Sequence, residues 1–265
     1  AGLDSSCKSA MVTAPPRSAG GGRRSRATSA TGGARSAMVR SVAWGPSGGA
    51  ALSTDGGVAR DLEDLAVGPC PQGSCVYLGD IGDNLTVRND YSVYRVAEPV
   101  VDLASDAGTV AVGFEHFDFG YPQGAHYNAE TLLVHPVLGD VYVLTKHGVG
   151  TRSRVYRFPR PLDPSARVVL EYVGEAPVPA AGDLPLTGGD ISPCGNAVLL
   201  RMYNRAVLLR VPQGMPFESV FTAPPVAVPV AAEPQGEAIT WSADGRGYFT
   251  SSEGAAQNLA RVACP

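Results

Sequence analysis

The chain has 265 residues, of which 44% are hydrophobic and 17% are charged, a composition typical of a folded soluble protein. Gly (32) and Pro (22) are abundant, which favours many tight turns over long helices. No apolar run approaches the ~18 residues that a membrane span needs. The net charge of −4 combines +6 in residues 1–60 (8 basic, 2 acidic) with −10 in the rest, and this acidic remainder argues against nucleic acid and for cations or cationic partners.

Residues 1–57 differ from everything after them. Between residues 14 and 36 they are almost entirely Ala, Gly, Arg, Ser and Pro, with few β-branched or aromatic side chains. Such a segment cannot bury enough apolar surface to offset the entropy lost on ordering, so we expect it to be disordered. A second hypothesis is that it is read out of frame, because GC-rich coding DNA in a wrong frame yields these residue types. The apolar patch at residues 38–44 predicts one strand.

From residue 61 the chain repeats a unit that opens with an acidic residue and a short apolar strand. The openings lie at residues 61–67, 128–134, 188–192 and 236–241. A turn rich in Pro, Gly, Asp or Asn follows each opening, because these residues accept the backbone angles of tight turns. Second strands are then predicted at residues 75–79, 141–145, 197–201 and 247–250. Third strands are predicted at 91–96, 154–158, 206–211 and 259–262, and fourth strands near 110–117 and 168–173.

The acids that open the units, at positions 63, 130, 190 and 237, recur at intervals of roughly 50 to 70 residues, which is typical of four-stranded propeller blades. We therefore predict an all-β fold, a β-propeller domain over residues 58–265 with four recognisable blades from residue 61 onward. A fifth blade, incomplete or degenerate, would have to come from the N-terminus. A β-sandwich is the alternative, but it would not restart each unit with the same signature.

The cysteines indicate an oxidising compartment. Cys70 and Cys75 bracket a short turn, which favours a disulfide within a hairpin over a zinc site, where CxxC pairs with a nearby His are more usual. Cys194 and Cys264 are able to form a second disulfide across the ring, which would leave Cys7 without a disulfide partner. We accordingly expect a secreted, periplasmic or cell-surface protein.

The polar residues are expected on one face of the propeller. In an up-and-down blade the start of the first strand and the end of the second lie at the same end of the sheet, and the first strand lines the central channel. The opening acids therefore share a face with the loops after the second strands, at residues 80–84, 146–148, 202–205 and 251–254.

Carboxylates that converge on one axis repel each other and raise each other's pKa unless a cation lies between them. Hard oxygen ligands suit Ca²⁺, so we predict a calcium site at the channel mouth. Its candidate ligands are Glu63, Asp64, Asp80, Asp83, Glu130, Asp190 and Glu237. Two alternatives stay open: the carboxylates are dispersed by water and Arg, or they share protons.

The same face carries candidates for catalysis. His126 and His147 titrate near neutrality and are candidate acid–base groups, while Lys146 and Arg201 are suited to hold an anionic substrate. Tyr203 lies in one of the same loops. The sequence contains no GxSxG, HExxH or P-loop motif.

Several motifs of the chain resemble those of a group of secreted bacterial β-propeller proteins that have no assigned reaction. The group carries D-W-E-D-I/L-A, G-D-I-G-D-N, T-G-G-D-I-S and Q-G-E-A-I, matched here by residues 61–66, 79–84, 187–192 and 235–239. The similarity spans residues 58–265, and Leu62 stands where the first of these motifs has Trp. Two further motifs of the group, Y-P-D-G and H-P-x-T-G-D, are matched at 121–124 and 135–140, with Gln123 in place of Asp and Leu138 in place of Thr. It implies the propeller fold and secretion.

Two classes of function follow from these residues. The first is a site with a cation that assists ligand or substrate binding at the channel mouth; if it is an enzyme, it is a metal-dependent hydrolase of phosphoesters or lactones. The second is a non-catalytic envelope or extracellular module that binds glycan, peptide or protein. In both cases we expect a monomer without an integral membrane segment.

Overall fold

The computed structural model describes residues 42–45, 48–53, 59–99, 109–111, 113–180, 182–254 and 257–264. In these ranges the regular structure is almost entirely β-strand, apart from the short 3-10 helices η1 (Pro122–Gly124) and η2 (Phe217–Thr222). No helix within these ranges is long and apolar enough to cross a membrane. Most of residues 1–57, with the segment expected to be disordered, lies outside them.

The chain folds as a β-propeller with four blades, as the sequence predicted. Blade 1 is a sheet in the order β11-β7-β5-β4-β3, and blades 2 and 3 are four-stranded sheets. Blade 4 has three strands in the described part of the chain. The strands of blade 1 are β3 (Leu62–Cys70), β4 (Gly73–Asp80), β5 (Tyr91–Ala97), β7 (Phe114–Gly120) and β11 (Val168–Val169).

The other three blades follow in chain order. Blade 2 contains β8 (Ala129–Val134), β9 (Val141–Thr145), β10 (Arg154–Arg157) and β12 (Glu171–Glu175). Blade 3 contains β13 (Leu186–Ile191), β14 (Ala197–Met202), β15 (Arg205–Arg210) and β16 (Val226–Val228). Blade 4 contains β17 (Gly236–Trp241), β18 (Gly247–Ser252) and β19 (Ala260–Ala263). The first three strands of every blade therefore lie where the sequence placed them.

The predicted fourth strands are each divided between two sheets. The stretch near 110–117 becomes β6 (Thr109–Ala111) and β7, and β6 leaves blade 1 to pair in parallel with β2 (Gly48–Ser53). The stretch near 168–173 becomes β11, which pairs in parallel with β7, and β12, which stays in blade 2. Strand β1 (Val42–Gly45), which overlaps the strand predicted at 38–44, completes the sheet β1-β2-β6. The rest of the expected fifth blade falls outside the described residues.

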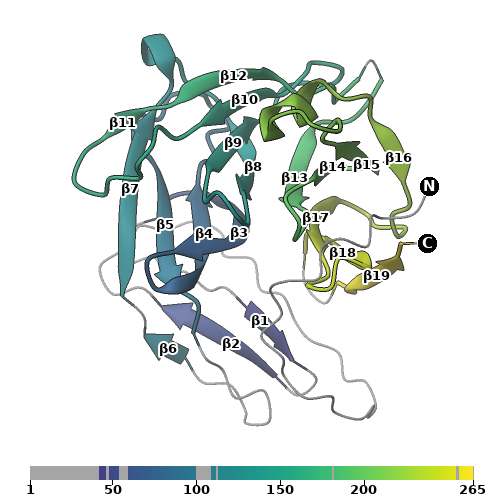
Figure 1. The fold of residues 1–265 in the computed structure, drawn as a ribbon, viewed down its shortest axis with the longest axis horizontal. Coiled ribbons are helices and arrows are strands. Elements are labelled where there is room, and N and C mark those ends of the chain that lie inside the picture. Colours follow the sequence, from purple (N-terminus) through teal and green to yellow (C-terminus); the bar gives the residue numbers. More distant parts are fainter. Residues whose placement is uncertain are drawn as a thin grey trace.

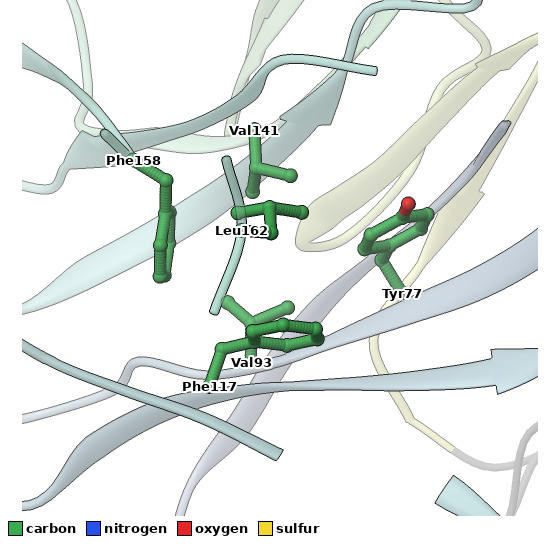
Figure 2. A pocket seen from close by; sticks show the side chains of 6 residues that line it. All are labelled: Tyr77, Val93, Phe117, Val141, Phe158 and Leu162. Carbon is green, nitrogen blue, oxygen red and sulfur yellow. The ribbon is translucent and has the colours of Figure 1, made fainter. Parts of the chain in front are cut away.

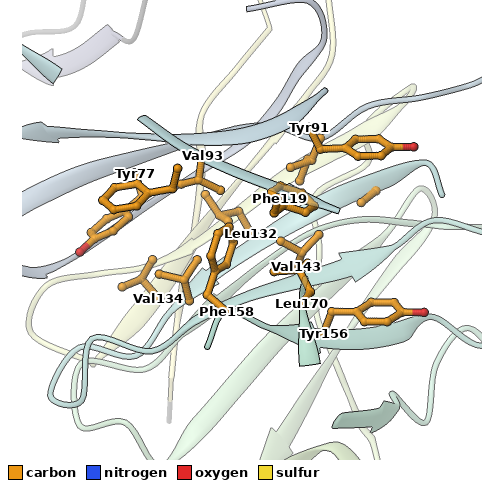
Figure 3. Close-up of a cluster of buried hydrophobic side chains, with 14 of the residues drawn as sticks. Tyr77, Tyr91, Val93, Phe119, Leu132, Val134, Val143, Tyr156, Phe158 and Leu170 are labelled. Carbon is orange, nitrogen blue, oxygen red and sulfur yellow. The ribbon is translucent and has the colours of Figure 1, made fainter. Parts of the chain in front are cut away.

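The first strands of the blades surround the centre of the ring. Figure 1 shows β3, β8, β13 and β17 innermost, and they contact each other in turn, β3 with β8, β8 with β13 and β13 with β17. Buried apolar clusters fill the spaces between successive blades. Between blades 1 and 2, side chains such as Tyr77, Phe119 and Leu132 interdigitate (Figure 3). A small apolar hollow at the edge of this cluster, with Phe117 and Leu162 among its walls (Figure 2), has no room for a water molecule.

The cysteines agree with one predicted pair and not with the other. Cys70 and Cys75 form a disulfide at the β3–β4 turn, with their Cα atoms 5.8 Å apart. Cys264 is a free thiol, while Cys194 takes part in a disulfide. The expected Cys194–Cys264 pair is therefore wrong.

Candidate functional site

A β-bulge interrupts the first strand of every blade near its start. The pairing of first and second strands skips one residue in each blade: Glu63, Glu130, Thr187 and Glu237. A bulge turns the side chain of its extra residue away from the regular alternation of the strand. Three carboxylates and one threonine therefore occupy equivalent positions around the ring.

The three bulge carboxylates lie close enough to influence each other's ionisation. Burial raises the pKa of Glu63 to about 8, and the charge of Glu130 is the next largest cause. Asp61 and Glu237 raise it further, while Lys146 lowers it. Burial likewise raises the pKa of Glu237 to about 7, with Glu130 contributing in the same direction. We define the mouth cluster as Asp61, Glu63, Glu130, Lys146, Tyr203 and Glu237.

Asp61 and Glu63 form a carboxyl–carboxylate pair. Their side chains are hydrogen-bonded, which requires a proton on one of them because ionised carboxylates only accept. The high pKa of Glu63 assigns the proton to its carboxyl group. Gly82 makes room for this pair, since a Cβ at that position would lie 2.3 Å from Glu63 Oε1 and 2.5 Å from Asp61 Oδ2.

Lys146 supplies the positive charge of the mouth cluster. Its ammonium group donates to Glu130 and, over 2.6 Å, to the hydroxyl of Tyr203. The ammonium also lies 4.8 Å from the centre of the Tyr203 ring. Lys146 comes from blade 2 and Tyr203 from blade 3, so the pair connects two blades across the mouth.

Glu237 accepts a hydrogen bond from a neighbouring side chain of its own blade. Gln235 Nε2 donates to Glu237 Oε1 over 3.0 Å and also to Glu253. This hydrogen bond lowers the pKa of Glu237, but burial outweighs it. At neutral pH the mouth cluster therefore contains a protonated carboxyl, Glu63, and a carboxyl near half-ionisation, Glu237, within range of one ammonium group.

Asp190 was predicted to be the fourth member of the ring of acids, and this prediction is wrong. The register places Thr187 at the bulge of blade 3, three residues earlier. Thr187 donates to the carbonyl of Gly236 over 2.9 Å. The Asp190 carboxylate instead accepts from Trp241 N and Thr240 Oγ1, each over 2.8 Å. Burial raises its pKa to about 6.

Asp64, another predicted metal ligand, holds the first strands of neighbouring blades together. Its carboxylate accepts from the backbone N–H of Leu132 over 2.9 Å and of Leu65 over 2.8 Å, and it is further hydrogen-bonded to the backbone of Gly189. Burial raises its pKa well above the ordinary value. Asp64 therefore joins three consecutive first strands, and its oxygens are occupied by backbone donors.

The acids of the G-D-I-G-D-N motif were predicted as metal ligands, and their contacts give them another role. Asp80 accepts from the backbone N–H groups of Arg60 and Asp61 and pairs with Arg88 over 2.9 Å. Asp83 accepts from two backbone N–H groups of its own loop and from the hydroxyl of Tyr91 over 2.6 Å. Both carboxylates hold loops in place, and their role as metal ligands stays a prediction.

Arg201 was expected to hold substrate, but it is buried. Its guanidinium pairs with Glu233 over 2.8 Å between blades 3 and 4, and its side chain is only 1% exposed. Burial lowers its pKa. Arg201 thus lies behind the mouth cluster and contributes through Glu233 to the packing of blade 4.

Neither predicted histidine contacts the mouth carboxylates. His126 Nδ1 lies 2.6 Å from the carbonyl of Arg88, in a pocket that is separate from the mouth cluster. His147 Nε2 lies 2.8 Å from Thr145 Oγ1, and its ring packs edge-on against Tyr127. Burial lowers the pKa of His147, and Arg154 lowers it further.

The structure brings together five residues that the sequence singled out: Glu63, Glu130, Lys146, Tyr203 and Glu237. Thr187 and Gln235 were not among the predicted site residues. The T-G-G-D motif contained the signal for Thr187, because its two glycines mark the strand interior and the bulge precedes them. In the described part of the chain, no three His, Cys, Asp or Glu side chains are arranged to hold a metal ion. The calcium site at the channel mouth therefore stays a prediction.

Fold and cluster together define a β-propeller whose central opening is lined by carboxyl groups. No family model matches the chain, and no curated protein does either, so the sequence resemblance stays a prediction. Among solved structures, the chain is similar to a 6-phosphogluconolactonase candidate from Bacteroides uniformis, with 13% sequence identity and a TM-score of 0.40. The match covers 74% of this chain and 66% of that one.

A second similar structure is a periplasmic gluconolactonase from Pseudomonas aeruginosa, with 13% identity, a TM-score of 0.35, and coverage of 76% of this chain and 67% of that one. The chain thus spans about two thirds of the length of each. Neither likeness bears on the chemistry of the mouth cluster.

Proposed function

We propose that the mouth cluster hydrolyses an uncharged, hydroxyl-rich small molecule of the lactone class. The observation that carries the proposal is the hydrogen-bonded Asp61–Glu63 pair, in which the pKa of Glu63 is raised to about 8. A carboxyl group that keeps its proton at neutral pH is a general acid, and a neighbouring carboxylate is a general base.

The two roles divide between carboxyl groups of different pKa. Water attacks the lactone carbonyl carbon and loses a proton to an ionised carboxylate, for which Glu237, with a pKa of about 7, is suited. Glu63 delivers its proton to the ring oxygen as the carbon–oxygen bond breaks. The ammonium of Lys146 and the hydroxyl of Tyr203 are the donors available to the carbonyl oxygen. The products are the hydroxyl and carboxyl ends of a hydroxy acid.

The charge of the site favours lactones over the phosphoesters that the sequence also left open. Lys146 is the cation of the mouth cluster and is already paired with Glu130. The remaining carboxyl groups would repel a phosphate, whereas they are good partners for the hydroxyl groups of a sugar lactone. The proton-transfer role that the sequence gave to His126 and His147 is accordingly assigned to Glu63.

The setting that we propose is extracytoplasmic. The Cys70–Cys75 disulfide and the disulfide of Cys194 support an oxidising compartment such as the periplasm, the cell surface or the medium. The substrate would then be a small molecule taken from the surroundings of the cell.

The test is turnover of a panel of sugar lactones by wild type, Glu63→Gln and the control Glu98→Gln, with spontaneous hydrolysis subtracted. We expect Glu63→Gln to lose about 10²- to 10⁴-fold in kcat, the usual contribution of a general acid, and the exposed control to keep full activity. Wild-type kcat should fall as pH rises through about 8, where Glu63 loses its proton.

The same panel separates the competing functions. Saturable binding without turnover, weakened by Glu63→Gln, would replace the proposal by a non-catalytic sugar-binding module. Turnover abolished by a chelator and restored by Ca²⁺ would replace it by the metal-dependent chemistry that the sequence suggested. Equal activity of Glu63→Gln and wild type would remove Glu63 from the mechanism.

A further inference from the structure

A second pocket lies apart from the mouth cluster and shares none of its residues. It has a volume of about 210 Å³. Its walls come from the loop before β5, from the end of β7 with the η1 segment that follows, and from the residues around β11. Pockets for drug-sized ligands span about 300–1,000 Å³, so this one suits a smaller molecule.

The pocket is positively charged. Its lining includes Arg88, Arg167 and His126 and contains no Asp or Glu. Arg88 is neutralised by ion pairs with Asp80 and Asp90. Within the described residues the side chain of Arg167 has neither a hydrogen bond nor an ion pair, so its charge is available to a ligand.

The backbone holds Arg167 at the pocket. Strand β11 pairs in parallel with β7, with Val168 opposite Phe119 and Val169 opposite Gly120. The amide of Leu170 donates to the carbonyl of Gly120 over 2.9 Å. A Cβ on Gly120 would lie only 3.1 Å from Arg167 Nη2. The glycine therefore lets the guanidinium lie directly against the end of β7.

Two further polar groups of the pocket have unused hydrogen-bonding capacity. His126 Nδ1 lies 2.6 Å from the Arg88 carbonyl, which only accepts, so Nδ1 carries the proton and Nε2 of the neutral ring is an acceptor. Tyr121 is 2% exposed, and in the described part of the chain its buried hydroxyl has no hydrogen-bond partner. The rings of Tyr91 and Tyr121 pack edge to face, with their centroids 5.2 Å apart, and form an aromatic wall of the pocket.

From this combination we infer that the pocket binds a small hydroxylated organic anion. Its carboxylate or phosphate pairs with the guanidinium of Arg167, and a hydroxyl group donates to His126 Nε2. Arginine presents a planar fork that matches such an anionic group in a bidentate manner. This site is independent of the function proposed for the mouth cluster.

The experiment is calorimetric titration of the full chain with gluconate and, separately, with inorganic phosphate, at constant ionic strength. The variants are Arg167→Gln and the control Arg246→Gln, which removes an equally exposed arginine from the β17–β18 turn. We expect at least one anion to bind wild type, Arg167→Gln to weaken it at least tenfold, and Arg246→Gln to change it less than twofold. Gluconate binding tighter than that of phosphate, with the advantage lost in His126→Ala, supports the hydroxyl contact.

Gly120→Ala provides an independent test, because its methyl group displaces the guanidinium without removing charge. It should weaken the same anion while leaving the circular dichroism spectrum and melting temperature close to wild type. The inference is overturned if neither anion binds wild type, or if Arg167→Gln and Arg246→Gln weaken binding equally. It is also overturned if Glu63→Gln, rather than Arg167→Gln, abolishes binding.

Discussion

At the residue scale, burial and proximity, rather than residue type, decide what each carboxyl group does. Glu63 and Asp80 are both acids near the start of blade 1. Asp80 accepts two backbone N–H groups and an arginine, while Glu63 shares a proton with another carboxylate. The first arrangement favours the ionised form and the second the protonated form. The sequence shows both as acids expected on the same face of the propeller, but only the three-dimensional contacts separate their roles.

The shifted pKa of Glu63 predicts how stability depends on pH. The folded-state pKa of about 8 lies above the ordinary value of 4.5, so the folded protein holds a proton that the unfolded chain releases between these values. Stability therefore falls as pH rises through this window, by up to about 1.4 kcal/mol per pH unit for one proton.

Glu63→Gln cannot ionise and should escape this loss. We expect the free energy of unfolding of Glu63→Gln minus that of wild type, measured with urea, to be about 1–3 kcal/mol larger at pH 8 than at pH 5. Glu98→Gln, an exposed acid, should stay parallel to wild type over the same range. Parallel curves for Glu63→Gln and wild type would contradict the assignment of the proton to Glu63.

At the scale of the strands, turn residues and alternation predicted the first three strands of every blade, but not their register. The sequence aligned Asp190 with Glu63, Glu130 and Glu237 because all four are acids that open a unit. The bulge shows that Thr187 is the equivalent residue. A bulge depends on hydrogen bonds with the second strand, which the local sequence records here only through the two glycines of the T-G-G-D motif. The predicted register of blade 3 was therefore wrong by three residues. As a result Asp190, whose carboxylate holds the backbone of blade 4, was expected at the site.

Two threonines provide a test of this register: Thr187 is the bulge residue of blade 3, and Thr131 follows the bulge residue of blade 2. Thr187 Oγ1 donates to the carbonyl of Gly236, whereas the buried Oγ1 of Thr131 has no hydrogen-bond partner among the described residues. Thr187→Val should therefore cost about 0.5–1.5 kcal/mol, the net value of a hydrogen bond, measured by urea unfolding. Thr131→Val should be neutral or slightly stabilising, because it removes an unsatisfied buried hydroxyl. Equal destabilisation by the two variants would contradict the assigned contacts.

At the scale of the whole molecule, the repeat predicted the propeller because each blade must bury both faces against its neighbours. Apolar clusters between successive blades meet that need. The sequence did not predict that β6 and β11 would cross to neighbouring sheets, since short strands of that kind have no turn signature of their own. These crossings connect blade 1 with blade 2 on one side and with the β1-β2-β6 sheet on the other.

Asp64 connects three blades through its carboxylate. From β3 it accepts from the backbone of Leu132 in β8 and of Gly189 in β13. Asp64→Ala leaves these buried N–H groups without an acceptor, and each such group costs about 1–3 kcal/mol. We expect a loss of about 2–4 kcal/mol in one cooperative transition, since three blades lose a common contact.

The matched control is Asp163→Ala, which should leave the melting curve unchanged. Among the described residues the Asp163 carboxylate accepts hydrogen bonds only from Ser165, in an exposed loop. Asp64→Asn keeps one acceptor oxygen and should fall between the two. A separate early transition in Asp64→Ala, detected by tryptophan fluorescence of Trp241 in blade 4 before the main loss of circular dichroism, would mean that the blades unfold independently. In that case the contacts of Asp64 would be local, and the mouth cluster, which draws on all four blades, would lose the rigid ring that its acid–base chemistry requires.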